Sequence, residues 1–218
     1  MAKEKQRKPT NLEPPDWEGM GLWDLIRSDF DRFTESFRLR GQEFSETKVW
    51  FESVVFKAGF QAVLLHRFSH WFHCCGMNYI AWFLARLSVM LTGAEIEFNA
   101  RIGPGLFIAH PVGIVIGRGS IIGRSATVFQ GVTFGVKSWS PDEIRAFPRT
   151  GDHCFFFAHA VVAGGVEVGD YCIVGANSVV NADVPDGGLV VGSPAKVTSK
   201  KAREKILSWR TQADQDSD

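Results

Sequence analysis

The sequence lacks an excess of charge of either sign: its 218 residues contain 24 lysines and arginines against 24 aspartates and glutamates. A balanced chain has no global field that attracts nucleic acid or an anionic membrane, so we expect neither partner. A long apolar run is also missing. The most apolar window, residues 79–91, is too short to span a bilayer and contains Arg86. We therefore predict no membrane span and a buried helix there, with a helix lying against a membrane as the alternative.

Cysteine is scarce as well. Only four are present, and two of them, Cys74 and Cys75, are adjacent in the sequence, which leaves no disulfide framework. No N-terminal segment combines a charged stretch, a long apolar core and a small-residue cleavage site in that order. These absences favour a cytoplasmic protein in a reducing environment.

Helical periodicity dominates the first part of the chain. Residues 1–15 are polar, charged and proline-bearing, which predicts a disordered tail. Over residues 16–92 the apolar spacing predicts a helical domain. We expect three helices in it: one from Leu22 to about Phe37, one from about Ser45 to Cys75, and one from about Asn78 to Thr92.

A six-residue period begins after Gly93, where glycine, valine and isoleucine multiply. Eight sextets fall into two blocks, residues 116–133 and 156–185. The first position of every sextet is apolar: Ile116, Ile122, Val128, Phe156, Val162, Val168, Val174 and Val180. Such sextets build a β-helix in which three short strands, separated by tight turns, close one coil.

The predicted architecture is therefore α+β, with the helical domain first. We place the β-helix at residues 93–197 and interpret residues 136–150, which contain no sextet, as a loop ejected from it. Residues 198–218 are expected to form a C-terminal helix or tail.

These features resemble one known family. The sextets, the segment GAEIEFNARIGPGLFIAHPVGIVIG (93–117), the ejected loop and the closing GSPAKV (192–197) resemble the hexapeptide-repeat acyltransferases, and most of all the serine acetyltransferases. The helical GFQAVLLHRFSHW (59–71) is similar to the N-terminal domain of that family. The resemblance implies a left-handed β-helix, a homotrimer or a dimer of trimers, and direct acetyl transfer from acetyl-CoA to the hydroxyl of a small-molecule acceptor, without a metal.

The resemblance also implies roles for individual residues. His110 would be the general base and Glu95 would orient it, because a neutral imidazole can take a hydroxyl proton and a carboxylate fixes its tautomer. The residues implied to contact acetyl-CoA are Gly135, Ala158, Ala176, Gly192 and Lys196, and backbone amides near Gly135 would face the developing oxyanion. Those expected around the acceptor are Ala109, Arg145, Phe147 and Arg149.

Three positions depart from the family's pattern for binding serine. Ala109 replaces an aspartate, and Ala146 and Phe147 replace an arginine and a histidine. Losing a buried charge partner weakens recognition far more than losing a methylene. Three functions stay open: acetylation of serine or a close analogue held in a changed way, acetylation of a sugar or specialised metabolite, and an inactive CoA-binding or scaffold trimer.

Several residues have a structural interpretation beside a chemical one. His110 would otherwise be a core histidine bonded to backbone. His66, His70, His73 and Cys74 are spaced to share a helix face as metal ligands do, but we interpret them as a packed face. Cys154 has no base paired with it in sequence that would make it a nucleophile. His159 is expected at an outward corner near the co-substrate or the acceptor.

Overall fold

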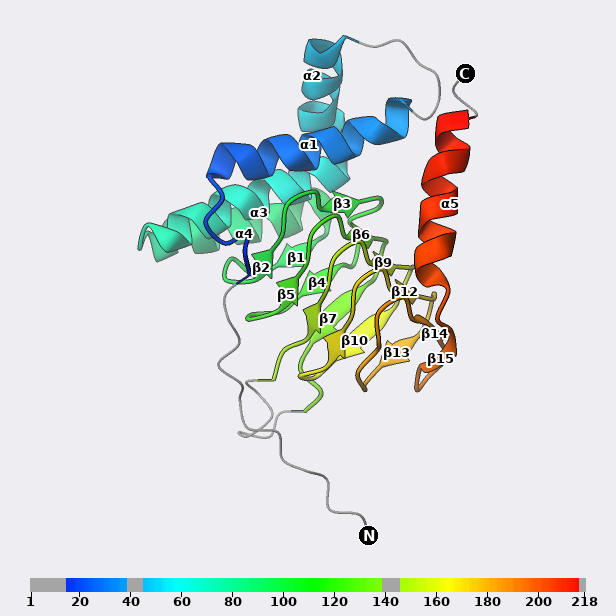
Figure 1. Ribbon diagram of the computed structural model, residues 1–218. Coiled ribbons are helices and arrows are strands. Elements are labelled where there is room, and N and C mark those ends of the chain that lie inside the picture. Colours follow the sequence, from blue (N-terminus) through cyan, green and yellow to red (C-terminus); the bar gives the residue numbers. More distant parts are fainter. Residues whose placement is uncertain (1–14, 39–44, 139–145, 216–218) are drawn as a thin grey trace.

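The computed structural model describes residues 15–38, 45–138 and 146–215 (Figure 1). Four helices precede all strands, and one follows them: α1 (Leu22–Arg38), α2 (Glu46–Phe56), α3 (Ala58–Cys74), α4 (Asn78–Thr92) and α5 (Ala202–Gln215). Helices α1, α3 and α4 lie across one end of the strands, and α5 runs along one side of them (Figure 1). In the described part of the chain, none of the helices has both the length and the apolar character needed to cross a bilayer.

The single helix predicted over residues 45–75 is wrong, because the chain breaks it at Lys57. This residue has extended backbone angles, φ −99° and ψ 93°, so α2 ends at Phe56 and α3 starts afresh at Ala58. The break accompanies a close contact at Gly59, where a β-carbon would collide with the carbonyl oxygen of Ile108. The first turn of α3 is packed directly on a strand backbone, and α2 leaves in another direction (Figure 1).

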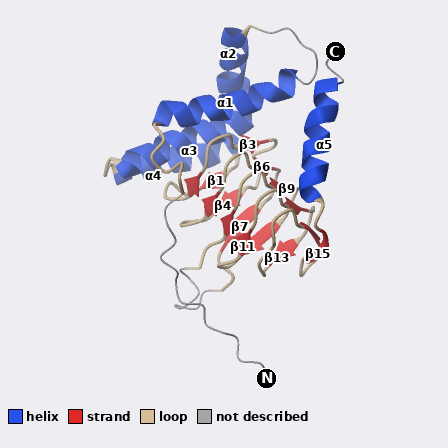
Figure 2. Cartoon of the chain, in the orientation of Figure 1, coloured by secondary structure: helices blue, strands red, loops and turns tan. Residues whose placement is uncertain are grey.

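The strands form three sheets and wind into a coil (Figure 2). Sheet A has the order β1-β4-β7-β10-β13, sheet B the order β11-β8-β5-β2, and sheet C the order β15-β14-β12-β9-β6-β3. The fourteen strands of the coil are β1 (Glu95–Ile96), β2 (Arg101–Ile102), β3 (Phe107–Ile108), β4 (Val115–Ile116), β5 (Ile121–Ile122), β6 (Thr127–Val128), β7 (Thr133–Gly135), β8 (Arg149–Thr150), β9 (Phe155–Phe156), β10 (Val161–Ala163), β11 (Glu167–Val168), β12 (Ile173–Val174), β13 (Val179–Val180) and β14 (Leu189–Val191). They pair in parallel, almost always with the strand three places along the chain, whereas β15 (Lys196–Ser199) closes sheet C antiparallel to β14.

The apolar position of each predicted sextet lies inside the coil. All eight of these side chains are at most 3% exposed. The loop expected over residues 136–150 ends earlier than predicted, because Arg149 and Thr150 form β8 and belong to sheet B. The coil also begins earlier than the sextets indicate, with Ile96, Ile102 and Ile108 already in its interior.

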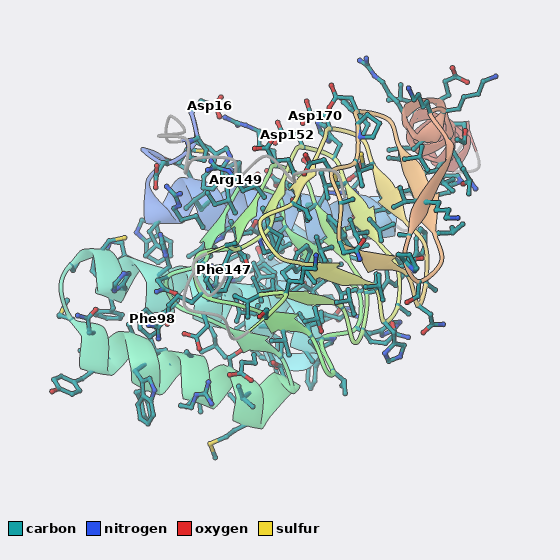
Figure 3. The ribbon with its side chains drawn as sticks, turned by 90° about the horizontal axis from the view of Figure 1, so that it is seen from below. Asp16, Phe98, Phe147, Arg149, Asp152 and Asp170 are labelled. Carbon is teal, nitrogen blue, oxygen red and sulfur yellow. The ribbon has the colours of Figure 1, made fainter. Side chains whose placement is uncertain are left out.

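Aspartates close the corner between sheets B and C. The carboxylates of Asp152, Asp170 and Asp186 accept the backbone N–H of Arg124, Asp152 and Asp170, at 2.7, 2.8 and 2.9 Å. Asp152 and Asp170 can be followed along this corner in Figure 3. A β-carbon at Gly151 would collide with the Asp170 carboxylate, so the corner needs glycine before each of the three backbone donors.

A buried ion pair joins the helices to the first coil. The Arg67 guanidinium of α3 donates to both carboxylate oxygens of Asp29 in α1, at 2.8 and 3.0 Å. It also donates to the carbonyl oxygens of Ile102 and Gly103, and the Leu106 N–H donates to Asp29 at 2.9 Å. The helical region is thus bonded to backbone that leads directly into β3.

We predict that Gly59→Ala lowers the free energy of unfolding by about 1–3 kcal/mol, because the added methyl group has to push α3 away from β3. Urea denaturation measures this change. The matched control is Gly19→Ala, since nothing lies within 4 Å of a β-carbon there. Equal transition midpoints for the two variants would contradict the close contact.

Candidate functional site

His110 lies in the corner between β3 and β4, and this corner is longer than the next one on the same edge. Interior Ile108 and Ile116 are eight positions apart, whereas interior Val128 and Phe134 are six apart. The two additional residues widen the turn, and His110 is exposed at it. The interpretation as a core histidine is therefore wrong.

A pocket of about 480 Å³ opens beside His110, between the first coil and the helices. The helical region contributes Phe33, Phe56, Lys57, Ala58 and Gly59 to its lining, and the coil contributes Phe107, Ile108, Ala109, His110 and Pro111. Sequence reasoning found His110 and Ala109 but missed every residue from the helices. The one signal in the sequence was Gly59, a glycine within a helical pattern, which indicates that another part of the chain packs closely there.

Glu95, the predicted partner of His110, lies on β1 of sheet A. Its carboxylate accepts a hydrogen bond from Arg86 of α4 at 2.9 Å, and both side chains are 42% exposed. An ion pair this exposed to water contributes little stability. Another cationic group could therefore displace Arg86 from the Glu95 carboxylate. The role of Glu95 toward His110 stays a prediction.

Three residues predicted to contact acetyl-CoA share one edge of the coil with His110, the edge between sheets C and A. Ala158 and Ala176 lie there in successive coils, linked by the Asn177 N–H donating to the Ala158 carbonyl at 3.0 Å. Gly192 lies beyond them and accepts the Val179 N–H at 2.9 Å. Lys196 is exposed on β15. An extended molecule can run along this edge toward His110.

Gly135 ends β7 of sheet A and Phe147 comes just before β8 of sheet B, so both lie on a different edge, between sheets A and B. Phe147 is labelled in Figure 3. The Phe147 ring covers a turn of its own chain: a β-carbon at Gly117 or Gly119 would lie 3.2 or 3.1 Å from ring carbons. Ala146 packs against Gly165 in the same way, at 3.1 Å. Both positions that differ from the family's loop pattern therefore hold packing side chains.

Arg149 and Arg145 complete the predicted acceptor residues. Arg149 lies on β8 in sheet B, and burial together with the charge of Arg101 lowers the pKa of its guanidinium. Arg145 lies outside the described residues. Within one chain, the structure groups Ala109 with His110 and leaves Phe147 and Arg149 elsewhere.

The histidines of α3 form a packed face. The Nδ1 atoms of His70 and His73 lie 2.8 Å from the Phe98 carbonyl and 2.7 Å from the Asn78 side-chain oxygen. His66 is 2% exposed, and burial lowers the pKa of its imidazole well below the usual value, with His70 and Arg67 adding to the effect. Burial lowers the pKa of His70 too. Within the described ranges, no three histidine, cysteine or acidic side chains are grouped to hold a metal.

Cys154 has the environment of a structural thiol. It is fully buried and donates to the Gly169 carbonyl at 3.1 Å. A hydrogen bond with the Cys172 thiol, together with burial, holds the pKa of Cys154 well above its usual value. The thiolate needed for nucleophilic attack is therefore disfavoured. His159 is exposed on the same edge as His110, with its ring packed over Gly131.

Comparison with known proteins gives one consistent result. Residues 147–182 match the family model for the bacterial transferase hexapeptide (six repeats). The chain is 38% identical over 149 residues to a serine acetyltransferase of Helicobacter pylori, a match that covers 68% of this chain and 86% of the relative.

Solved structures agree with this match. The serine acetyltransferase of Neisseria gonorrhoeae in complex with serine superposes with a TM-score of 0.70 at 28% identity, over 82% of this chain and 69% of that one. The Brucella abortus serine acetyltransferase in complex with coenzyme A gives 0.70 at 27% identity, over 80% and 66%.

The buried histidine predicts how stability depends on pH. Because the folded-state pKa of His66 is lowered, its contribution is fully present above the unfolded value of about 6.5 and is lost as the pH falls below it. We expect urea midpoints to fall between about pH 7.5 and about pH 5.5, and to fall less in His66→Gln. An unchanged slope in His66→Gln would refute the assignment.

Proposed function

Because the chain belongs to the serine acetyltransferase family of hexapeptide-repeat acyltransferases, we propose that it transfers acetyl from acetyl-CoA to an acceptor hydroxyl with His110 as general base. One observation carries the assignment of the base. The wide corner after β3 places His110 outside the coil, at a 480 Å³ pocket and on the edge that also holds Ala158 and Ala176.

In this reaction His110 takes the acceptor's proton while the hydroxyl oxygen attacks the thioester carbon. The new ester C–O bond forms, the C–S bond breaks, and CoA leaves as a thiol with the proton that His110 returns. Glu95 exchanges its weak contact with Arg86 for the imidazolium and stabilises that charge. Acetyl-CoA supplies the acyl group as co-substrate, and no metal takes part.

We further propose that the coil is a left-handed β-helix and that the active unit is a trimer or a dimer of trimers. The support is the separation of the predicted residues onto two edges of each chain. His110 and Ala158 flank sheet A on one side, and Gly135 and Phe147 flank it on the other. In a threefold assembly, one edge of each protomer meets the opposite edge of the next, which brings Gly135 amides to the site of the oxyanion.

The similarity supports the serine acetyltransferase type of reaction. Neither a sugar acceptor nor an inactive scaffold is supported by any of the relatives described. All four cysteines are free, which supports a reducing, cytoplasmic setting.

We predict that His110→Ala lowers kcat/KM about 10²–10⁴-fold in an assay of CoA thiol release with a panel of hydroxyl acceptors. Glu95→Gln lowers it less and moves the acid limb of the pH–rate profile, since it acts through the imidazole. His73→Gln is the matched control, because that side chain bonds Asn78 away from the pocket. Retained turnover in His110→Ala would eliminate this base.

A further inference from the structure

We propose that Phe129 and Phe157 determine how the thioester donor is recognised. Their rings form an apolar wall against which the pantetheine arm of acetyl-CoA lies, with one ring at the height of each of its two amides. This inference rests on the proposed function, since it names specificity residues of the same reaction. It follows from a break in the glycine pattern of the coil, from the contacts of the two rings and from their register to His110.

The position directly after an interior residue is glycine where the coils pack most tightly. At the corner between sheets B and C, four successive coils have glycine there, and a β-carbon at any of them would lie 2.8 Å or less from an atom of the following coil: Gly103, Gly123, Gly151 and Gly169. At the edge between sheets C and A, the same position holds Ala109, Phe129 and Phe157, before glycine returns at Gly175. Two large side chains thus leave the coil on the edge that holds His110.

The two rings stack on each other and are supported from one side. Their centroids lie 5.1 Å apart, with 17° between the ring planes. Trp209 of α5 packs against Phe157 at 6.4 Å and against Phe155, on the outer face of sheet C, at 5.5 Å. Phe129 and Phe157 are both partly exposed. Because α5 supports the rings from sheet C, the surface that they leave exposed borders the edge between sheets C and A.

Small side chains lie beside the rings on this edge. Ala158 follows Phe157 directly, and Ala176 takes the same place in the next coil. Beyond them the His159 imidazole lies over Gly131, where a β-carbon would be 2.1 Å from Nδ1. The alanines therefore separate the rings from the imidazole, and an extended chain that is laid over them contacts both.

The register places the rings next to His110. The backbone N–H of Ala109 donates to the residue before Phe129 at 3.1 Å, and that of Phe129 donates to the residue before Phe157 at 3.0 Å. The three residues therefore lie in successive coils, about 4.8 Å apart. In an extended pantetheine arm, the first amide nitrogen lies about 4 Å from the sulfur and the second about 5 Å further. With the thioester at His110, the first amide reaches the coil of Phe129 and the second reaches the coil of Phe157.

An aromatic wall suits this arm for a physical reason. The arm alternates methylene pairs with amide groups. The methylenes gain free energy when the rings remove them from water, and an amide N–H can point at a ring face. Neither ring carries a charge that a phosphate could use, so the wall recognises the arm and not the nucleotide. We expect donors that keep the arm and lack the nucleotide to depend on the wall as acetyl-CoA does.

The test shortens the donor one amide at a time, using the full-length chain and thiol release with serine as the acceptor. The donors are acetyl-CoA, S-acetylpantetheine with both amides, and S-acetyl-N-acetylcysteamine with the first amide alone. Phe129→Ala lowers kcat/KM for all three donors about three- to tenfold, the size of one aromatic contact. Phe157→Ala lowers it as much for the first two donors and leaves the third unchanged.

The comparison is made among donors within one variant. A smaller folded fraction lowers all three values alike, so it cannot imitate the pattern expected for Phe157→Ala. The matched control Phe51→Ala removes an exposed ring of α2 and keeps the wild-type ratios between donors. Equal losses for all three donors in Phe157→Ala, or no loss in either wall variant, overturn the inference and leave the proposed function standing.

Direct binding separates failure of the inference from failure of the function. CoA and pantetheine are titrated by calorimetry into the wild-type chain and into Phe157→Ala, a measurement that needs no turnover. Weaker binding of both ligands to Phe157→Ala, by a similar factor, supports the wall even if the wild-type chain releases no thiol, in which case the proposed reaction fails. Equal affinities of the two chains for both ligands overturn the inference.

Discussion

The buried pair between Asp29 and Arg67 is the interaction on which the site depends. It takes two charges out of water and bonds them to each other and to the carbonyls of Ile102 and Gly103. Removing one partner of such a pair typically costs about 3–5 kcal/mol, because the other charge is left buried and alone. Here the loss would weaken the packing of the helices on the first coil, and this packing forms the pocket beside His110.

The rest of the site arises where the regular coil is interrupted. The corners between sheets B and C are regular and pack glycine under a carboxylate from the next coil, as at Gly151 and Asp170. Two insertions interrupt the regular coil. Two additional residues push His110 outward, and a longer insertion leads to Phe147 on the opposite edge of sheet A. The regular repeats thus form the frame, and the departures from them hold the residues that we propose for function.

The sequence predicted the interior of the coil well because one physical rule governs it: a side chain at every sixth position has to be apolar, as Val128 and Val174 are. The sextets begin only at Ile116, since the eight-residue spacing from Ile108 to Ile116 disrupts the period, although the predicted β-helix already begins at residue 93. Sequence reasoning placed one helix where Lys57 separates two, because helical propensity does not report a distant backbone such as that of Ile108. The pocket was missed for the same reason: half of its lining comes from residues far away in sequence.

The aspartate corner has a direction. Each backbone donor lies upstream in the chain and each carboxylate that satisfies it lies in the coil that follows, from Arg124 to Asp152 and from Asp170 to Asp186. During synthesis, a coil therefore emerges with its corner unfinished and is completed by its successor. After the last of these aspartates, the carbonyl of Gly187 accepts the Ala202 N–H, so the first turn of α5 bonds to the final corner. Each coil thus stabilises the corner of the coil that precedes it in the chain.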